Sequence, residues 1–198
     1  AGAARQMAEP VGGMRSLRVL ARRVDYPTQE LQAAAGELIE IIDQERRLPA
    51  ALRTALMDWC QRIADADLLE LQSEYVARFD KGRATSLLLF EHVHGESRDR
   101  GQAMVDLMAE YNAAGFELDA RELPDYLPVF LEYLSRRPAP EAAALLAETA
   151  AILLELATVR DGAEVDDDFL CLLEYDGARV SLQAGSLVAD PPPRFRVN

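Results

Sequence analysis

The segment SLLLFEHVHGESRDRGQAM, residues 86–104, decides the fold of this chain. Its first half is almost entirely apolar, and Gly95 separates that half from a highly charged second half. An apolar run that ends at a glycine predicts a short buried helix, and Ser97 is well placed to cap a second, amphipathic helix. Both histidines of the protein lie at this joint, and the residues around them do not have the spacing of a known catalytic motif.

Upstream of this segment, apolar residues recur with helical spacing and predict four helices. The first stops at Pro27, the second has Thr28 as its N-cap, the third has Pro49 in its first turn, and the fourth begins at Asp67 and ends at Gly82. The side chains expected to face the core are, in helix order, Leu17, Leu20, Ala21 and Val24; Leu31, Ala35, Leu38 and Ile42; Leu52, Leu56, Trp59 and Ile63; and Leu71, Tyr75, Val76 and Phe79.

Downstream, three more helices are predicted. The helix after Ser97 ends at Gly115, and the segment ELPDYLPVFLEYL, residues 122–134, predicts a helix with Pro124 in its first turn. The last helix runs from Glu141 to about residue 160. The buried positions are expected at Met104, Leu107, Met108 and Tyr111 in the first of these helices, and at Leu127, Phe130, Leu131 and Leu134 in the second.

The 198 residues are enough for one domain with its own core. We expect a disordered lead over residues 1–13, an all-helical domain over 14–160, and an acidic linker with an atypical tail over 161–198. Within that tail, Asp176 and Gly177 lie between two alternating segments and predict a β-hairpin. The predicted fold is therefore all-α, a single-domain helical bundle with a short non-helical C-terminal tail.

Composition limits the classes of partner. The chain has 34 acidic and 21 basic residues, and its net charge of −13 disfavours nonspecific binding to nucleic acid and favours basic partners. No apolar run approaches the ~18 residues that a membrane-spanning helix needs, so direct membrane insertion is not expected. Cys60 and Cys171 are far apart in sequence and are expected to be buried thiols in a reducing compartment.

Catalysis and metal binding find little support in the sequence. His92 and His94 are two residues apart, so on a helix they point about 200° away from each other and do not chelate one ion. No cofactor is predicted. A small hydrolase that uses these histidines with Ser97 and the acids around Glu96 is the alternative from a different functional class.

The residues of the predicted helices favour a binding groove over a catalytic site. Tyr75, Tyr126 and Tyr133 are the candidates for its walls, because tyrosine tolerates a half-exposed site with its hydroxyl outward. Glu122 and Asp125 either attract a basic peptide or are solvated acids at a helix start, and the sequence leaves both interpretations open. The same holds for several apolar and aromatic side chains, which either line the groove or belong to the core: Met104, Met108, Tyr111 and Phe130.

Residues 86–104 and 122–134, read together, resemble the molybdoenzyme maturation chaperones, the family that includes TorD, DmsD and NarJ, and in particular its nitrate reductase branch. The resemblance extends over residues 14–157 and ends after Val159. The family's acidic signature before a helix matches Glu122, Asp125 and Tyr126, with tyrosine where many relatives have histidine. A second family element, Tyr-x-x-x-Phe-Asp, matches Tyr75, Phe79 and Asp80.

This resemblance implies a cytoplasmic chaperone and not an enzyme. Such a protein binds the N-terminal segment of the apo-catalytic (alpha) subunit of nitrate reductase until molybdenum cofactor and iron–sulfur centres are inserted, before membrane docking. Delivery proteins of the molybdenum cofactor are a further implied partner. The alternatives are a chaperone for another molybdoenzyme and one that itself holds the cofactor nucleotide. The predicted partner-binding residues are Tyr75, Phe79, Asp80, His92, His94, Glu96, Arg98, Glu122, Asp125, Tyr126 and Tyr133.

Overall fold

The computed structural model of the protein describes residues 14–45, 48–80, 82, 85–95, 97–118 and 121–158. Within them the chain forms nine helices and one isolated antiparallel bridge, which confirms the predicted all-α class. The predicted lead, linker and C-terminal hairpin lie outside the described residues. The helices are α1 (Ser16–Arg23), α2 (Gln29–Ala33), α3 (Ala35–Gln44), α4 (Ala50–Asp65), α5 (Leu68–Phe79), α6 (Leu89–His94), α7 (Asp99–Ala113), α8 (Leu127–Ser135) and α9 (Ala139–Thr158).

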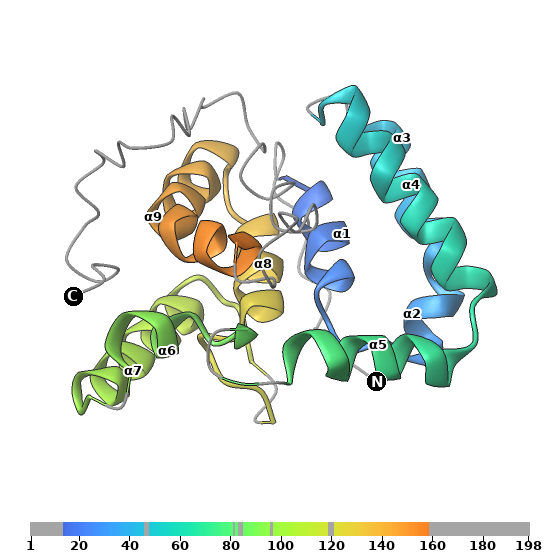
Figure 1. Ribbon diagram of the computed structural model, residues 1–198. Helices are drawn as coiled ribbons and strands as arrows, with labels where there is room; N and C mark the ends of the chain where they lie inside the picture. Colours follow the sequence, from blue (N-terminus) through green and yellow to red (C-terminus); the bar gives the residue numbers. More distant parts are fainter. Residues whose placement is uncertain are drawn as a thin grey trace.

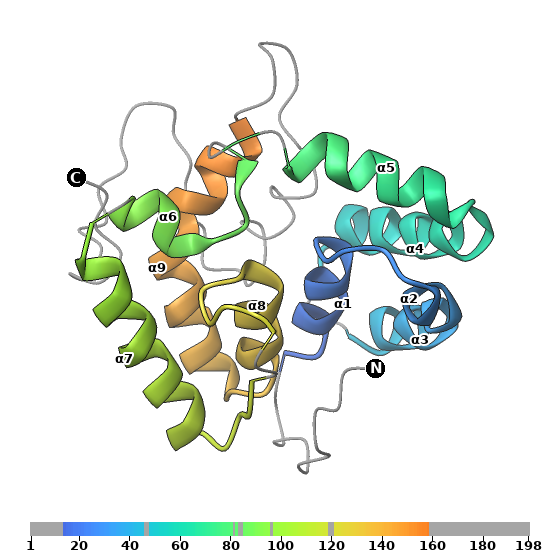
Figure 2. The ribbon, with the colours of Figure 1, turned by 90° about the horizontal axis from the view of Figure 1, so that it is seen from below.

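Helix α1 lies between two groups of helices (Figures 1 and 2). On one side it packs against α8, and on the other against α3, which in turn packs against α4. The predicted inward face of α1 is buried, and Val19 on its opposite side is fully buried as well. An amphipathic pattern indicates one buried face, whereas a helix between two layers is covered on both. The buried side chains form one contiguous core from Met14 to Leu153.

Most predicted helix starts and stops are present in the structure. The Thr28 hydroxyl accepts from the Leu31 N–H at 3.2 Å, and the Asp67 carboxylate accepts from the N–H groups of Leu69 and Glu70. Gly95 and Gly115 end α6 and α7 with positive φ of 56° and 70°. The single helix predicted after Thr28 is divided at residue 34 into α2 and α3, although all four of its predicted core residues are buried.

The start of α6 is held by a segment far away in sequence. Residues 87–89 run antiparallel to residues 125–127, with an isolated bridge between Leu88 and Tyr126. The Leu127 N–H donates to the Leu87 carbonyl at 2.8 Å, and the Leu89 N–H donates to the Asp125 carbonyl at 2.9 Å. The short buried helix predicted before Gly95 therefore begins only at Leu89, because Leu88 is extended for this pairing.

Asp125 corrects a sequence-based expectation. We expected an exposed carboxylate at the polar end of a helix, but Asp125 is fully buried. Its Oδ2 atom accepts from the Phe90 N–H at 3.1 Å, which caps α6 from outside the helix, and the Arg100 guanidinium lies 3.7 Å away. Burial raises the pKa of this carboxyl above its usual value, although the Phe90 hydrogen bond and the Arg100 charge act in the opposite direction.

Helix α8 begins at Leu127 with Pro128 in its first turn, whereas the sequence suggested a start near Pro124. The Pro124 carbonyl instead accepts from the buried Tyr111 hydroxyl at 2.8 Å, which ties this segment to α7. The predicted seam of α8 is confirmed, since all of its members are buried: Leu127, Phe130, Leu131 and Leu134. Among the described helices, none combines the length and the apolar character needed to cross a membrane.

Replacing Phe130 by alanine is expected to lower the free energy of unfolding by about 3–5 kcal/mol, because the phenyl ring is 1% exposed and its loss leaves a cavity. Chemical denaturation followed by circular dichroism measures this change. Val105→Ala is the matched control, since Val105 is 62% exposed and its truncation is expected to change stability by about 0.5 kcal/mol or less. Equal losses in the two variants would contradict the core position of Phe130.

Asp125→Ala is expected to destabilise the protein by about 1–3 kcal/mol, because the buried Phe90 N–H loses its acceptor. Asp125→Asn keeps an oxygen acceptor and should cost less. The folded-state pKa of Asp125 is raised from 3.8, so the contribution of this one carboxyl to stability is largest below pH 3.8 and is lost as pH rises through the folded pKa. Denaturation across this range should therefore favour Asp125→Asn increasingly at higher pH. An unchanged difference at all pH values would argue against a raised pKa.

Candidate functional site

Two of the predicted motifs meet at one hollow, which we name the tyrosine groove. Its volume is about 490 Å³, and it lies between the end of α5, the start of α6 and Tyr126. Tyr75, Phe79 and Asp80 come from one motif and Tyr126 from the other, although about 50 residues separate them in sequence. The groove is lined by Tyr26, Tyr75, Val76, Phe79, Asp80, Gly82, Ser86, Leu87, Glu91 and Tyr126.

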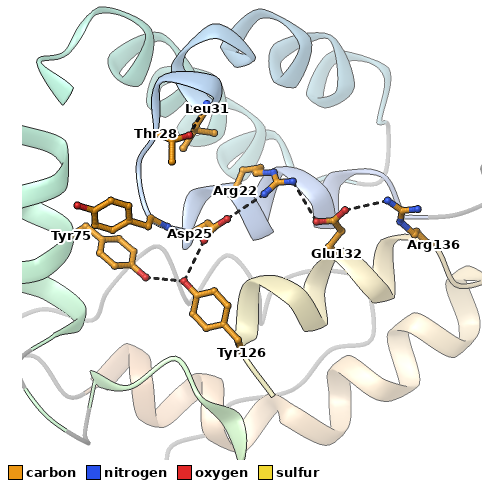
Figure 3. Close-up of polar contacts among 9 residues, drawn as sticks. Arg22, Asp25, Thr28, Leu31, Tyr75, Tyr126, Glu132 and Arg136 are labelled. Atoms are coloured by element: carbon orange, nitrogen blue, oxygen red, sulfur yellow. Dashed lines mark hydrogen bonds and ion pairs between the residues drawn. The ribbon is translucent and has the colours of Figure 1, made fainter. Parts of the chain in front are cut away.

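A chain of hydrogen bonds holds the two central tyrosines (Figure 3). The hydroxyls of Tyr75 and Tyr126 are 3.0 Å apart, and the Tyr126 hydroxyl donates to Asp25 at 3.3 Å. Asp25 also pairs with Arg22 on α1, at 3.2 Å. The network therefore joins α5, the segment after α1, and the residue that precedes α8. Two of the groove's aromatic walls are positioned by polar contacts behind them.

The same network continues along the interface between α1 and α8. Arg22 reaches Glu132 on α8 at 3.3 Å, and Arg136 pairs with the other oxygen of Glu132 at 3.1 Å (Figure 3). These charges are partly exposed, so each pair contributes little to stability by itself. The pair between Arg22 and Glu132 joins α1 to α8, and Arg22 also contacts Asp25, the acceptor of the Tyr126 hydroxyl.

The tyrosines remain neutral. Burial raises the pKa of Tyr126 far above its usual range, and the nearby Asp25 carboxylate adds to this shift. Burial also raises the pKa of Tyr75, partly offset by its hydrogen bond with Tyr126, while the charge of Glu122 contributes to the increase. Neither phenol is poised to exchange a proton near neutral pH. These hydroxyls serve as hydrogen-bonding groups and not as acid–base catalysts.

Ring contacts set the shape of the groove. Tyr26 meets Tyr75 edge to face, with ring centroids 5.2 Å apart, and Tyr75 meets Phe79 at 4.9 Å. Tyr26 is 43% exposed and Val76 is 45% exposed, so both offer apolar surface at the opening. Val76 was predicted to face the core, and the structure corrects this. Sequence reasoning also missed Tyr26, because a tyrosine before Pro27 has no spacing that relates it to α5.

Two carboxylates give the groove its negative charge. Asp80 is exposed at the C-cap of α5, and Glu91 on α6 accepts from the Ser86 hydroxyl at 2.5 Å. Both line the groove together with the aromatic rings. Aromatic and aliphatic walls with carboxylates beside them suit an apolar segment that carries a cationic side chain.

The two histidines do not share a site, in agreement with their predicted divergence. The Nε2 atom of His92 lies 2.7 Å from the Ser86 carbonyl, whereas the His94 ring packs edge to face against Phe90, with centroids 5.6 Å apart. Ser97 accepts from the Asp99 N–H and donates to the Asp99 carboxylate, so its hydroxyl belongs to the start of α7. The part of the chain that the structure describes contains no group of three or more His, Cys, Asp or Glu placed to hold a metal ion.

The remaining predicted residues are dispersed. Tyr133 was expected to be half-exposed, but it is 1% exposed and its hydroxyl donates to Glu110 at 3.2 Å, while burial raises its pKa to about 12. Arg98 and Glu122 are exposed and do not belong to the lining of the tyrosine groove. Asp125 supports α6 from the core, and Glu96 lies outside the described residues.

Cys60 is a buried free thiol on α4, as predicted. Burial raises its pKa to about 11, and the charge of Arg23 only partly offsets this shift. A thiol with so high a pKa is almost entirely protonated near neutral pH and is a poor nucleophile. Cys171, the other predicted thiol, lies outside the described residues.

The sequence of the chain is similar to that of known proteins. The family model for the nitrate reductase delta subunit matches residues 45–162. The nitrate reductase molybdenum cofactor assembly chaperone NarJ of Escherichia coli (strain K12) is 48% identical over 140 residues, which cover 71% of this chain and 59% of that protein. The probable assembly chaperone NarW of the same strain is 46% identical over 140 residues, covering 71% and 58%.

The alignment with a more distant relative covers a larger share of that relative's length. The probable nitrate reductase molybdenum cofactor assembly chaperone NarJ of Bacillus subtilis (strain 168) is 27% identical over 165 residues, which cover 81% of this chain and 89% of that protein. The chain thus spans somewhat under two thirds of the two Escherichia coli relatives. The family model covers more than half of the chain, including all of α5 to α9. The chain belongs to the nitrate reductase delta subunit family.

Proposed function

We propose that this protein is a cytoplasmic assembly chaperone for respiratory nitrate reductase. It binds the N-terminal segment of the apo-catalytic subunit and holds that subunit until molybdenum cofactor and iron–sulfur centres have been inserted, before the enzyme docks at the membrane. The molybdenum cofactor is cargo for the client and not a resident group of this chain. Family membership supports the chaperone role, and the relatives named above are described as assembly chaperones.

The observation that carries the proposal is the convergence of the two family motifs on the tyrosine groove. Tyr75 and Tyr126 are joined through their hydroxyls, and Asp80 lies on the same lining. Binding energy comes from the aromatic and aliphatic walls, and the carboxylates favour a basic segment over an acidic one. The raised pKa values of Tyr75 and Tyr126 keep both hydroxyls protonated, so they are available as hydrogen-bonding groups for a bound segment.

Polar contacts hold one side of the groove, and the other side is open. The polar chain from Tyr126 through Asp25 to Arg22 fixes the ring positions before a ligand arrives. Tyr26 and Val76 remain partly exposed at the opening. A preformed aromatic wall reduces the conformational entropy that is lost on binding, which favours recognition of a peptide segment.

The full-length protein is expected to bind a synthetic peptide with the N-terminal sequence of its cognate catalytic subunit, and the affinity should fall as salt rises because part of the attraction is Coulombic. Isothermal titration calorimetry at two salt concentrations measures this. Asp80→Asn should weaken binding at low salt, whereas Asp58→Asn, an exposed acid on α4, should not. No heat and no competition at any salt concentration would exclude this ligand. Tighter binding of the corresponding peptide from another molybdoenzyme would reassign the client.

Val76→Lys is expected to reduce peptide affinity by at least about tenfold, because it places a long cationic side chain at the opening of an acidic groove. Ala77→Lys is the matched control, one residue further along the exposed side of α5 and not in the lining. Both variants should melt near the wild-type temperature. If the two lysines weakened binding equally, the effect would be one of net charge and the tyrosine groove would not be the peptide site.

A further inference from the structure

A second hollow, which we name the α7 groove, lies among α6, α7, α8 and α9 and shares no lining residue with the tyrosine groove. Its volume is about 530 Å³. The floor is apolar and brings together Phe90 from α6, Leu107 from α7, Phe130 from α8 and Leu145 from α9. Leu145 remains partly exposed, whereas Phe90, Leu107 and Phe130 are core residues whose surfaces form the bottom of the hollow.

One edge of the α7 groove is a line of carboxylates. Asp99, Asp106 and Glu110 all line the hollow, and they are spaced seven and four residues apart on α7. At 100° per residue this spacing returns to the same helix face, and at 1.5 Å per residue the line is about 16 Å long. Asp99 accepts from the Ser97 hydroxyl and Asp106 from the Gln102 amide, and both of these donors are neutral. These two hydrogen bonds therefore leave the charges of Asp99 and Asp106 in place.

His94 lies at the end of the α7 groove and contains a buried, unpaired ring nitrogen. The Nε2 atom of His94 is inaccessible to solvent and has no hydrogen-bond partner among the described residues, and His94 is part of the lining. An unpaired buried polar atom costs free energy in the unliganded protein.

We propose that the α7 groove binds a cationic amphipathic helix of a partner protein, at a site separate from the tyrosine groove. The apolar floor takes the apolar face of that helix. Lysine or arginine side chains at one edge, spaced four and seven residues apart, pair with Glu110, Asp106 and Asp99 when the helix lies along α7. An acidic helix is rejected by the same carboxylates, and the net charge of −13 adds to this selectivity. The inference does not depend on the ligand of the tyrosine groove.

The test uses the full-length protein and a synthetic helix of about 16 residues with a leucine face and lysines at the matching spacing. The matched control probe has glutamate in place of each lysine. Calorimetry at low salt is expected to show one equivalent of the lysine probe bound and no binding of the glutamate probe. A saturating amount of the N-terminal peptide that tests the tyrosine groove should not displace the lysine probe.

Variants locate the site. The double variant Asp99→Asn/Asp106→Asn should weaken probe binding by about 4–25-fold at low salt, because each exposed ion pair contributes about 2–5-fold. Ala103→Gln, which fills the hollow from α7 without changing charge, should weaken it as well. Asp58→Asn on α4 should bind the probe as the wild type does. Circular dichroism and thermal melts establish that each variant is folded.

Three results would overturn the proposal. Wild-type affinity in both Asp99→Asn/Asp106→Asn and Ala103→Gln would show that the probe binds elsewhere. Displacement of the probe by the N-terminal peptide would show a single shared site. Sedimentation that reveals a dimer closed through the α7 groove, with the probe excluded, would assign this face to a second copy of the chain.

Discussion

The antiparallel contact between residues 87–89 and 125–127 positions the functional surfaces of this protein. It supplies acceptors to the first N–H groups of α6, which no intrahelical carbonyl can satisfy: the Asp125 carbonyl for Leu89 and the Asp125 carboxylate for Phe90. Because α6 is a single short helix, its direction depends on these external acceptors. Glu91 on α6 then lines the tyrosine groove, while Phe90 and His94 line the α7 groove. Both hollows therefore depend on how this one contact places α6.

The burial of Asp125 destabilises its charged form but also places its carboxylate where it can cap α6. Its carboxylate is fully buried and its pKa is raised by desolvation, so the folded state carries an electrostatic penalty at neutral pH. That penalty is tolerated because the carboxylate caps α6 and because the Arg100 side chain approaches to 3.7 Å. Immediately beside it, Tyr126 points its hydroxyl toward Tyr75 and Asp25. Asp125 thus caps α6, whereas the adjacent Tyr126 lines the tyrosine groove.

The arrangement favours recognition over chemistry. The tyrosine hydroxyls are neutral, the one described thiol is protonated, and the two histidines point toward different surroundings. What the surface offers instead is apolar area beside carboxylates, in the tyrosine groove and again in the α7 groove. Binding through modest apolar contacts and screened charges is reversible, as the proposed chaperone role requires.

The sequence by itself determined the all-helical class, most helix boundaries and the family. These are encoded locally, in the 3.6-residue periodicity, in caps such as Thr28 and Asp67, and in the glycines that end α6 and α7. Only the tertiary structure decided which motif residues reach the surface. Asp125 and Tyr133 were predicted to bind the partner but lie in the core, whereas Tyr26 and Val76 were not predicted to bind it but line the groove. Exposure depends on which segments pack together across long sequence separations, and local periodicity carries no information about that pairing.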